Sequence, residues 1–150
     1  MIRRKLKSAE VKKNPYIVWN AFIDLLAMED ESDLSEKQRI AHDAFWYDSE
    51  IQNGGHMQYF ENKFKKDYSG IIKSLNLIGA KKQAKIFEKA VKQFTKKNRK
   101  IIETVKEYVE IALEGEYDKY DQEYGKVKPE MNEYLEKYLE KNKNEFIEIK

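Results

Sequence analysis

The stretch IQNGGHMQYFEN, residues 51–62, decides how this chain folds, because it sets two adjacent glycines inside a long run of helix-forming residues. Glycine tolerates positive φ and lets the backbone turn sharply, and the side chain of Asn53 can cap a helix that starts after the pair. We therefore expect a structural corner between two helices, with Tyr59 and Phe60 packing inward. The alternative is an anion site, since backbone N–H groups at a helix start bind phosphate or carboxylate. Neither G-x-G-x-x-G nor G-K-[ST] is present, so the sequence favours the corner.

Helix signals extend on both sides of this corner. Asn14-Pro15 has the pattern of a helix start, with a capping side chain before a proline at the first helical position. Ser35 and Gln38 form a capping-box pattern at the start of the helix that leads into the glycine pair. Downstream, Gly79 stands where a glycine ends a helix. Together these signals predict consecutive helices with short connections.

The composition places these helices in one domain. The chain has 150 residues with two prolines and six glycines, and a chain of this length buries a core without disulfides. We predict an all-α fold, a compact single-domain bundle of about six to eight helices over residues 14–150, preceded by a basic N-terminal arm at residues 1–13. The tail NEFIEIK, residues 144–150, alternates briefly in polarity. This pattern is compatible with two structures, a strand and an extension docked on the bundle.

Three features that the sequence lacks narrow the class of protein. There is no cysteine, which excludes disulfides and thiolate sites and favours the cytoplasm. The basic N-terminal residues hold no uninterrupted apolar stretch, so we expect no secretory signal. No apolar run reaches the length of a membrane span, so we expect no membrane association.

The net charge of +2 hides four blocks of alternating sign. Residues 1–13 carry six Lys/Arg against one glutamate, and residues 14–62 carry ten carboxylates against two basic residues. Residues 81–106 carry ten Lys/Arg against two glutamates, and residues 107–150 carry thirteen carboxylates against seven lysines. Such blocks either create local fields on the surface or neutralise one another across helices. Both alternatives are open at this stage.

The sequence gives little support to an enzyme or a metalloprotein. His42 and His56 are the only histidines, they fall on different predicted helices, and no H-E-x-x-H motif occurs. We expect a surface or helix-start position for each and no metal site, although carboxylates that could complete one lie nearby in sequence: Asp43, Asp48, Glu50 and Glu61. No serine has a nucleophile-elbow context. We therefore predict no catalytic residue and no cofactor.

Two amphipathic helices are predicted in the second half of the chain. The first, within residues 81–100, sets Phe87 and Phe94 opposite a row of lysines that can track phosphates or can be an ordinary solvated face. That row consists of Lys85, Lys89, Lys92 and Lys96. A further helix over residues 101–112 carries the apolar residues Ile101, Val105, Tyr108 and Ala112.

A tyrosine-rich segment follows, in which three tyrosines share one helical side and three acids flank them. Tyrosine beside carboxylates is typical of protein-binding surfaces. Core packing with the hydroxyls reaching the surface is the alternative, and the pattern favours it. The candidate partner-binding residues are Tyr117, Asp118, Tyr120, Asp121, Glu123 and Tyr124.

The motif around the glycine pair also resembles a known family. NGGHMQYFEN, residues 53–62, is similar to the N-G-G-x-x-Q-Y-F-x-N signature of a bacterial family known for a DNA-mimic protein. Three later segments resemble that family in the same order, at residues 75–80, 117–124 and 131–142, and the similarity covers residues 15–146. The motif residues are expected to be architectural: Asn53, Gly54, Gly55, Gln58, Tyr59, Phe60 and Asn62.

The resemblance implies an all-helical protein without known catalytic activity, whose best-known kind of member places an acidic surface on the DNA-binding face of a transcription factor. The net charge of +2 departs from that pattern. Mimicry then requires the acids of residues 14–62 or 107–140 to form one face away from Lys81–Lys100. Our leading prediction is a non-enzymatic protein-binding module, with a transcription regulator as the partner that the resemblance implies. The alternative is a nucleic-acid-binding protein that uses the basic arm and the helix at residues 81–100.

Overall fold

The computed structural model describes residues 1–64 and 66–150, and the all-α prediction is confirmed. The described residues form nine α-helices, one 3-10 helix and two short strands. The helix count exceeds the predicted six to eight because two of the helices, α1 and α9, are only six and four residues long. In chain order the elements are β1 (Arg4–Leu6), α1 (Ser8–Lys13), α2 (Ile17–Met28), η1 (Glu31–Asp33), α3 (Glu36–Asn62), α4 (Tyr68–Leu77), α5 (Lys81–Thr95), α6 (Val105–Ala112), α7 (Asp118–Lys126), α8 (Met131–Lys141), α9 (Lys143–Phe146) and β2 (Ile147–Ile149).

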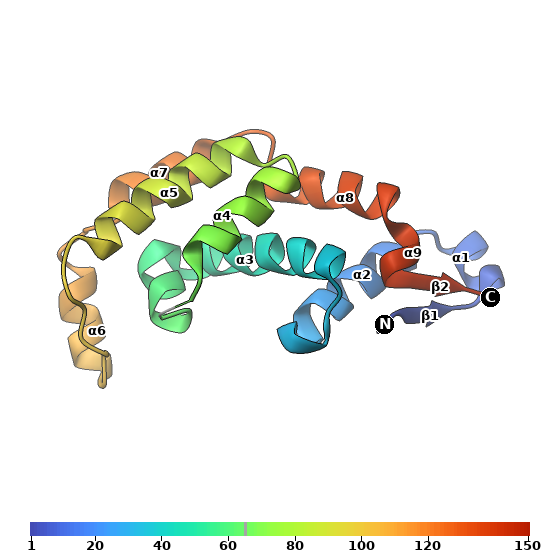
Figure 1. The fold of residues 1–150 in the computed structure, drawn as a ribbon, viewed down its shortest axis with the longest axis horizontal. Coiled ribbons are helices and arrows are strands. Elements are labelled where there is room, and N and C mark those ends of the chain that lie inside the picture. The colour runs from blue at the N-terminus through green and yellow to red at the C-terminus, as the bar shows by residue number, and fades with distance from the viewer. Residues whose placement is uncertain (65) are drawn as a thin grey trace.

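The long helix α3 is the centre of the architecture. Helices α2, α4, α7 and α8 all pack against it, and α5 packs on α4 and α7. Figure 1 shows α5 and α7 along one edge of the molecule, α3 through its middle and α6 at one end. The predicted capping box starts α3, since the Ser35 hydroxyl accepts the Gln38 N–H and the Gln38 side chain accepts the Ser35 N–H.

Other helix boundaries follow local signals less uniformly. The prediction that Asn14 caps a helix with Pro15 at its first position is wrong, because α2 begins at Ile17 and its N-cap position is Tyr16, with no side-chain capping hydrogen bond. Helix α4 is capped by Asp67, whose side chain accepts the Gly70 N–H at 3.1 Å, and the chain leaves it through Gly79 at φ 99°. These signals act within one turn of helix, so neighbouring residues suffice to predict them.

The two ends of the chain meet in a parallel ladder. Arg4 pairs with Ile147 and Leu6 with Ile149, so the tail forms a strand, one of the two alternatives left open. Residues 1–13, predicted as a basic arm, contain β1 and α1. The fully buried amide of Gln38 donates to the Ile2 carbonyl at 2.6 Å and to the Glu145 carbonyl at 2.7 Å, which fixes both ends to α3.

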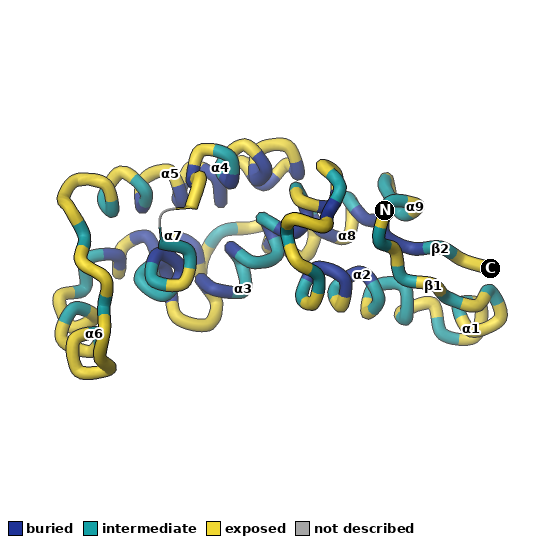
Figure 2. The backbone as a smooth tube through the Cα atoms, turned by 60° about the horizontal axis from the view of Figure 1, so that its bottom comes forward, coloured by how far each residue is buried: buried dark blue, intermediate teal, exposed yellow. Residues whose placement is uncertain are grey.

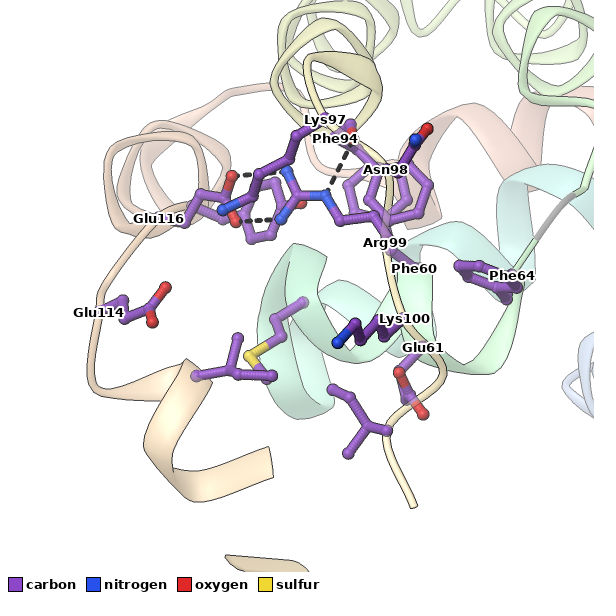
Figure 3. A pocket seen from close by; sticks show the side chains of 14 residues that line it. Phe60, Glu61, Phe64, Phe94, Lys97, Asn98, Arg99, Lys100, Glu114 and Glu116 are labelled. Carbon is purple, nitrogen blue, oxygen red and sulfur yellow. Dashed lines mark hydrogen bonds and ion pairs between the residues drawn. The ribbon is translucent and has the colours of Figure 1, made fainter. Parts of the chain in front are cut away.

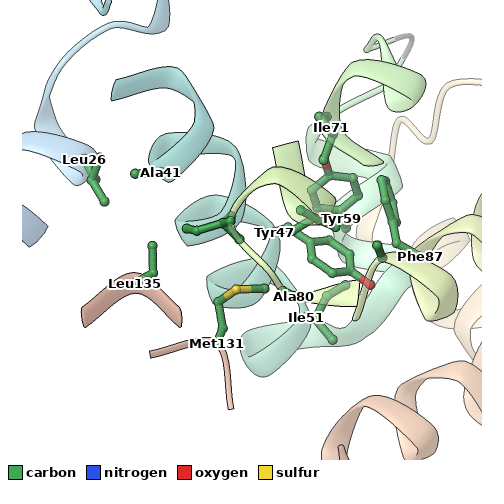
Figure 4. Packing of buried hydrophobic residues seen from close by; sticks show 14 of the residues in the cluster. Leu26, Ala41, Tyr47, Ile51, Tyr59, Ile71, Ala80, Phe87, Met131 and Leu135 are labelled. Atoms are coloured by element: carbon green, nitrogen blue, oxygen red, sulfur yellow. The ribbon is translucent and has the colours of Figure 1, made fainter. Parts of the chain in front are cut away.

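The core is a continuous cluster with an aromatic centre. Tyr47 is fully buried and its ring lies 4.5 Å from that of Phe87 and 5.4 Å from those of Tyr59 and Tyr124. Figure 4 shows Tyr47, Tyr59 and Phe87 of this group beside an aliphatic region that includes Leu135. Because α3 supplies residues to both regions, its shape determines how the rest of the molecule is arranged.

Helix α6 is packed differently from the others. It begins at Val105, so Ile101, predicted inside the helix, precedes it. None of its residues is buried, and Figure 2 shows this end of the molecule as mainly exposed.

Candidate functional site

The glycine pair forms a kink inside α3. Gly55 has φ 76° and ψ −173° within an otherwise continuous helix, so the expected corner is a bend between two halves of one element. A Cβ atom at Gly55 would lie 2.5 Å from Oδ2 of Asp121. Glycine is therefore required twice, for the left-handed backbone and for the close approach of α7.

The second half of α3 is capped from a distant helix. Oδ1 of Asp121 accepts the backbone N–H of His56 at 2.9 Å and lies 2.7 Å from Nδ1 of the His56 ring. Nε2 of the same ring lies 2.7 Å from the Tyr47 hydroxyl. The prediction that Asn53 caps this helix is wrong, because the cap is the side chain of Asp121. His56 does start the second half of α3, but its ring is fully buried, so it is no surface residue.

Further side chains join the two halves of α3 across the kink. Glu50 lies before the bend and accepts hydrogen bonds from the amides of Gln58 and Asn62, both at 2.8 Å. Gly54 makes room for this arrangement, since a Cβ there would lie 2.1 Å from Oε1 of Gln58. Tyr59 and Phe60 are each 2% exposed. The motif residues thus make contacts within the chain, as an architectural role requires, and Asn53 is exposed.

The three tyrosines at the N-cap of α7 and within it lie in the core. Tyr117, Tyr120 and Tyr124 are 6%, 8% and 5% exposed, and the Tyr124 hydroxyl donates to Oδ1 of Asp48 at 2.7 Å. The prediction that their rings line a contact surface is wrong, because this side of α7 packs against α3 and α5. The three tyrosines are core residues, which agrees with the alternative prediction of core packing.

The acids that flank these tyrosines do not form one free patch. Asp121 is bound to His56, and Glu123 forms an ion pair with Lys89 at 3.3 Å. Asp118 is exposed. A binding role for these three carboxylates stays a prediction.

The acidic block at residues 14–62 is largely neutralised or hydrogen-bonded inside the chain. Arg4 forms ion pairs with two of its carboxylates, both at 2.7 Å, and Lys66 pairs with a third. Four more are held by protein hydrogen bonds. The seven carboxylates are Asp24, Glu29 and Glu31 in ion pairs, and Asp30, Asp43, Asp48 and Glu50 in hydrogen bonds.

A row of free carboxylates lies on α8. Glu133, Glu136 and Glu140 are exposed, and no ion pair involves them in the part of the chain that the structure describes. At about 100° per residue they fall within about 60° of helix surface, and the buried residues Met131, Leu135 and Leu139 lie on the other side of the helix. We call Glu133, Glu136 and Glu140 the α8 acidic ridge. Lys137 and Lys141 lie along one of its flanks.

Sequence reasoning did not single out these glutamates. Their signal was present, because spacings of three and four residues opposite an apolar stripe define the outer face of a helix. The tyrosines of α7 were the more conspicuous pattern, and their burial could be established only from the packing of α7 against α3 and α5.

A basic row occupies α5. Its lysines are exposed on one side of the helix, as predicted for a solvated or phosphate-tracking face. Lys89 is paired with Glu123. We call the set the α5 lysine ridge: Lys81, Lys85, Lys89, Lys92 and Lys96.

His42 is also buried, contrary to the expectation of a surface position. Its side chain is 8% exposed, and burial lowers its pKa to about 4. Burial raises the pKa of the neighbouring Asp43 to about 6. Among residues 1–64 and 66–150, no three His, Asp or Glu side chains are grouped so as to hold a metal ion.

An apolar hollow of about 310 Å³ lies where the ends of α3 and α5 meet the segment before α6. The rings of Phe60 and Phe94 stack in it at 4.3 Å. Figure 3 shows the Arg99 guanidinium beside the Glu116 carboxylate, with contacts of 2.7 and 2.6 Å. This hydrogen-bonded pair lowers the pKa of Glu116 to about 2, and it leaves neither group free for a ligand.

Membrane insertion finds no support in the helices. Within the described ranges, each helix is too short or too polar to cross a bilayer.

Comparison with known proteins places the chain in a family. The sequence model of the DMP19-like proteins, named for DNA mimic protein 19, matches residues 32–142. That match spans about three quarters of the chain and includes the whole of α3 and α8. No curated protein and no solved structure matches the chain. The resemblance noted from the sequence is thereby confirmed, and the chain belongs to the DMP19-like protein family.

Proposed function

We propose that this protein is a non-enzymatic, cytoplasmic protein-binding module that presents the α8 acidic ridge to the DNA-binding face of a transcription regulator. The observation that carries the proposal is a row of three unpaired carboxylates on a rigid helix, in a member of a family named for DNA mimicry.

The spacing of the ridge suits a surface that normally binds DNA. With a rise of about 1.5 Å per residue, Glu133 and Glu140 are about 10.5 Å apart along the helix axis. One DNA strand carries a phosphate about every 3.4 Å along its axis. The ridge therefore sets three negative charges along a length over which one DNA strand carries about four phosphates.

The ridge is also held in place before any partner arrives. The opposite side of α8 is anchored by Met131 and Leu135, which are 2% and 0% exposed. A preformed row of charges loses little conformational entropy on binding and steers a basic partner toward it. A local field of this kind does not require a negative net charge on the whole protein.

The test is capture of DNA-binding proteins from a bacterial lysate, followed by elution with duplex DNA. We expect a captured regulator that the duplex releases, because both ligands use the same basic face. The variant Glu133→Gln/Glu136→Gln/Glu140→Gln should lose the capture. As the matched control, Lys137→Gln/Lys141→Gln on the same helix should bind at least as tightly, and Asp118→Asn/Glu123→Gln on α7 tests separately the binding role that the sequence predicts for those carboxylates. Capture that survives the triple substitution, or that duplex DNA does not compete, contradicts the proposal.

A second function, nucleic-acid binding, is favoured by the five lysines aligned on α5. Binding through the α5 lysine ridge would depend steeply on salt, because each phosphate contact releases about 0.9 counterion on B-DNA. Replacing Lys85, Lys89 and Lys92 with glutamine should then reduce the slope of log K against log salt by about 3. The absence of any mobility shift at low salt would exclude this function.

A further inference from the structure

A groove adjoins the α8 acidic ridge, with walls from α2, α3 and the start of α8. It has a volume of about 530 Å³. Helices α2 and α8 both pack against α3, and Figure 1 shows them beside the same half of that helix, away from α6. We call this feature the α2–α8 groove. Its lining includes three apolar residues, Trp19, Ile23 and Phe45, and three amide residues, Gln52, Asn53 and Asn132.

The apolar part of the groove is fixed from below and open from above. Trp19, Ile23 and Phe45 are half-buried. The ring of Trp19 rests against that of the core residue Phe22, with the ring centroids 5.5 Å apart. Aromatic side chains that are held by the fold and still accessible are typical anchors of protein interfaces.

The amide side chains of the groove keep hydrogen-bonding groups that the chain does not use. Gln52, Asn53 and Asn132 are exposed. Among the residues that the structure describes, Gln52 makes one long contact of 3.5 Å with Asp48, and no hydrogen bond involves the side chain of Asn53 or Asn132. Each amide can donate and accept at the same time. The groove therefore offers a use for Asn53, a motif residue without a hydrogen bond inside the fold.

The groove and the ridge share one side of α8. At about 100° per residue, the three ridge glutamates lie about 40°, 80° and 100° around the helix from Asn132. Lys137 and Lys141 lie beyond them, about 140° and 180° from Asn132. Glu136 is one turn after Asn132, so their Cβ atoms are about 5–6 Å apart. A partner seated in the groove thus meets the carboxylates before it meets the lysines.

We propose that the α2–α8 groove receives the recognition helix of the regulator, with the α8 acidic ridge in place of a row of phosphates and the three amides in place of base edges. This inference rests on the proposed function and assigns the element of the partner that it binds. An α-helix is the element that enters the major groove of B-DNA, and a helix in a groove is a common mode of protein recognition.

The chemistry of the groove matches what a recognition helix carries. Arginine, asparagine and glutamine on such a helix pair with base edges, and apolar side chains contact the thymine methyl group. The amides of Gln52, Asn53 and Asn132 can pair with the same polar side chains. Ile23 and Phe45 offer apolar contacts where the methyl group would be.

The two parts of the surface then divide the work of recognition. Contacts to phosphates position a DNA-binding protein, and contacts to base edges give it specificity. A row of carboxylates alone attracts any basic surface. The groove adds selectivity for a partner whose helix carries amides and apolar residues beside its basic edge.

The chain's own basic helix α5 cannot supply this occupant. Its apolar side is packed in the core, with Ala84 and Phe87 at 2% and 0% exposure. The occupant is therefore assigned to another protein.

The first experiment measures fluorescence polarisation with three labelled, stapled helical peptides. The probe has glutamine and isoleucine along one side and arginines along one edge. One comparison peptide replaces each arginine with citrulline, which removes the charge and keeps the shape, and the other replaces each glutamine with alanine. We expect both to bind about tenfold more weakly than the probe, a difference of about 1.4 kcal/mol. Equal binding of the probe and the alanine peptide would overturn the proposal.

The second experiment assigns each contact with variants of the full chain whose helicity is checked by circular dichroism. Gln52→Ala/Asn53→Ala/Asn132→Ala should bind the probe about tenfold more weakly and no longer distinguish it from the alanine peptide. Glu133→Gln/Glu136→Gln/Glu140→Gln should no longer distinguish the probe from the citrulline peptide. The matched control is Asn98→Ala/Gln122→Ala, which removes two exposed amides far from α8 in sequence and should leave the Kd unchanged.

The pattern of losses separates this inference from the proposed function. Weaker binding in the ridge variant with full affinity in the amide variant would overturn the inference and leave the proposed function in place. Weaker binding in the amide variant alone would contradict the proposed function and keep the groove as a helix-binding site. A dimer in sedimentation velocity that the amide substitutions abolish would assign the groove to self-association and overturn the inference.

Discussion

At the scale of single residues, Gly55 combines a left-handed backbone with a contact too close for any side chain. Gly55→Ala should lower the free energy of unfolding by about 2–4 kcal/mol, since positive φ costs alanine about 1–2 kcal/mol and the new Cβ must displace Asp121. Urea denaturation measures the loss. Gly125→Ala is the matched control, because nothing lies within 4 Å of the Cβ position of this helical glycine. It should be neutral or stabilise by up to about 1 kcal/mol. Equal stability of the two variants would contradict this role of Gly55 in the kink.

His42 and Asp43 are neighbours whose burial acts on stability in opposite directions as pH changes. The pKa of His42 falls from 6.5 to about 4, so its contribution is present above pH 6.5 and is lost as pH falls toward 4. The pKa of Asp43 rises from 3.8 to about 6, so its contribution is present below pH 3.8 and is lost as pH rises through 6. Between pH 4 and 6 the two effects offset each other.

Substituting either residue should therefore reveal the pH dependence of stability that the other residue contributes. Relative to the unsubstituted protein, Asp43→Asn should lose about 2 kcal/mol of stability between pH 6.5 and 4.5, a value discounted for partial solvation. His42→Phe should gain a similar amount over the same interval. Urea unfolding at a series of pH values measures both slopes, and parallel profiles for all three proteins would refute the compensation.

The roles of residues that depend on partners distant in the chain could not be predicted from the sequence. The ring of His56 is buried because Tyr47 and Asp121 satisfy its two nitrogens, and Asp121 lies 65 residues away. A sequence pattern contains no record of such a partner. The burial of Tyr59 and Phe60 followed from the motif itself, because a helix bent toward the core directs the residues after the bend inward.

At the scale of elements, α3 keeps its bend through the hydrogen bonds that Glu50 accepts from both sides of the kink. Glu50→Ala should cost about 2–3 kcal/mol, because the amides of Gln58 and Asn62 lose a charged acceptor. A double-mutant cycle with Asn62→Ala should give a coupling of about 1 kcal/mol. Gln52→Ala is the control on the same helix, since its contact with Asp48 is long, at 3.5 Å, and exposed. A coupling near zero would show that Glu50 does not join the two halves.

Elements whose signals are local were predictable, and elements that need a partner were not. The capping box at Ser35 and the helix stop at Gly79 lie within the sequence windows that predicted them. Strand β1 has three residues and exists because β2 lies beside it. The exposure of α6 was equally hidden, because its apolar periodicity is that of a buried helix and the sequence does not show that nothing covers it.

At the scale of the whole molecule, the fold depends on its N-terminal residues. Residues 1–7 supply β1, the Ile2 carbonyl that accepts from Gln38, and Arg4, which binds Asp24 and Glu29. Removing them should lower the stability by about 3 kcal/mol or more, because the buried amide of Gln38 and the edge of β2 lose their partners. Thermal unfolding compares this truncation with removal of Met1 alone, which is 70% exposed and should be neutral. Equal midpoints would show that β1 is dispensable.

The charge blocks illustrate what sequence shows about the whole molecule and what it omits. The sequence shows the charge blocks. It is compatible both with a free acidic face on the surface and with blocks that neutralise one another. Arg4 and Lys66 form ion pairs with three of the ten carboxylates of the first acidic block, while the glutamates of α8 stay free. The choice between the alternatives depends on which surfaces meet, and this follows from the bend of α3.

The parallel ladder of β1 and β2 also determines how the molecule would respond to mechanical force. The N-terminus enters at one end of the ladder and the C-terminus leaves at the other (Figure 1). Pulling on the two termini would slide the strands past each other and load all the hydrogen bonds between them at once, whereas an antiparallel pair would open one bond at a time. Tethers at both ends would thus pull against the ladder in its stronger direction.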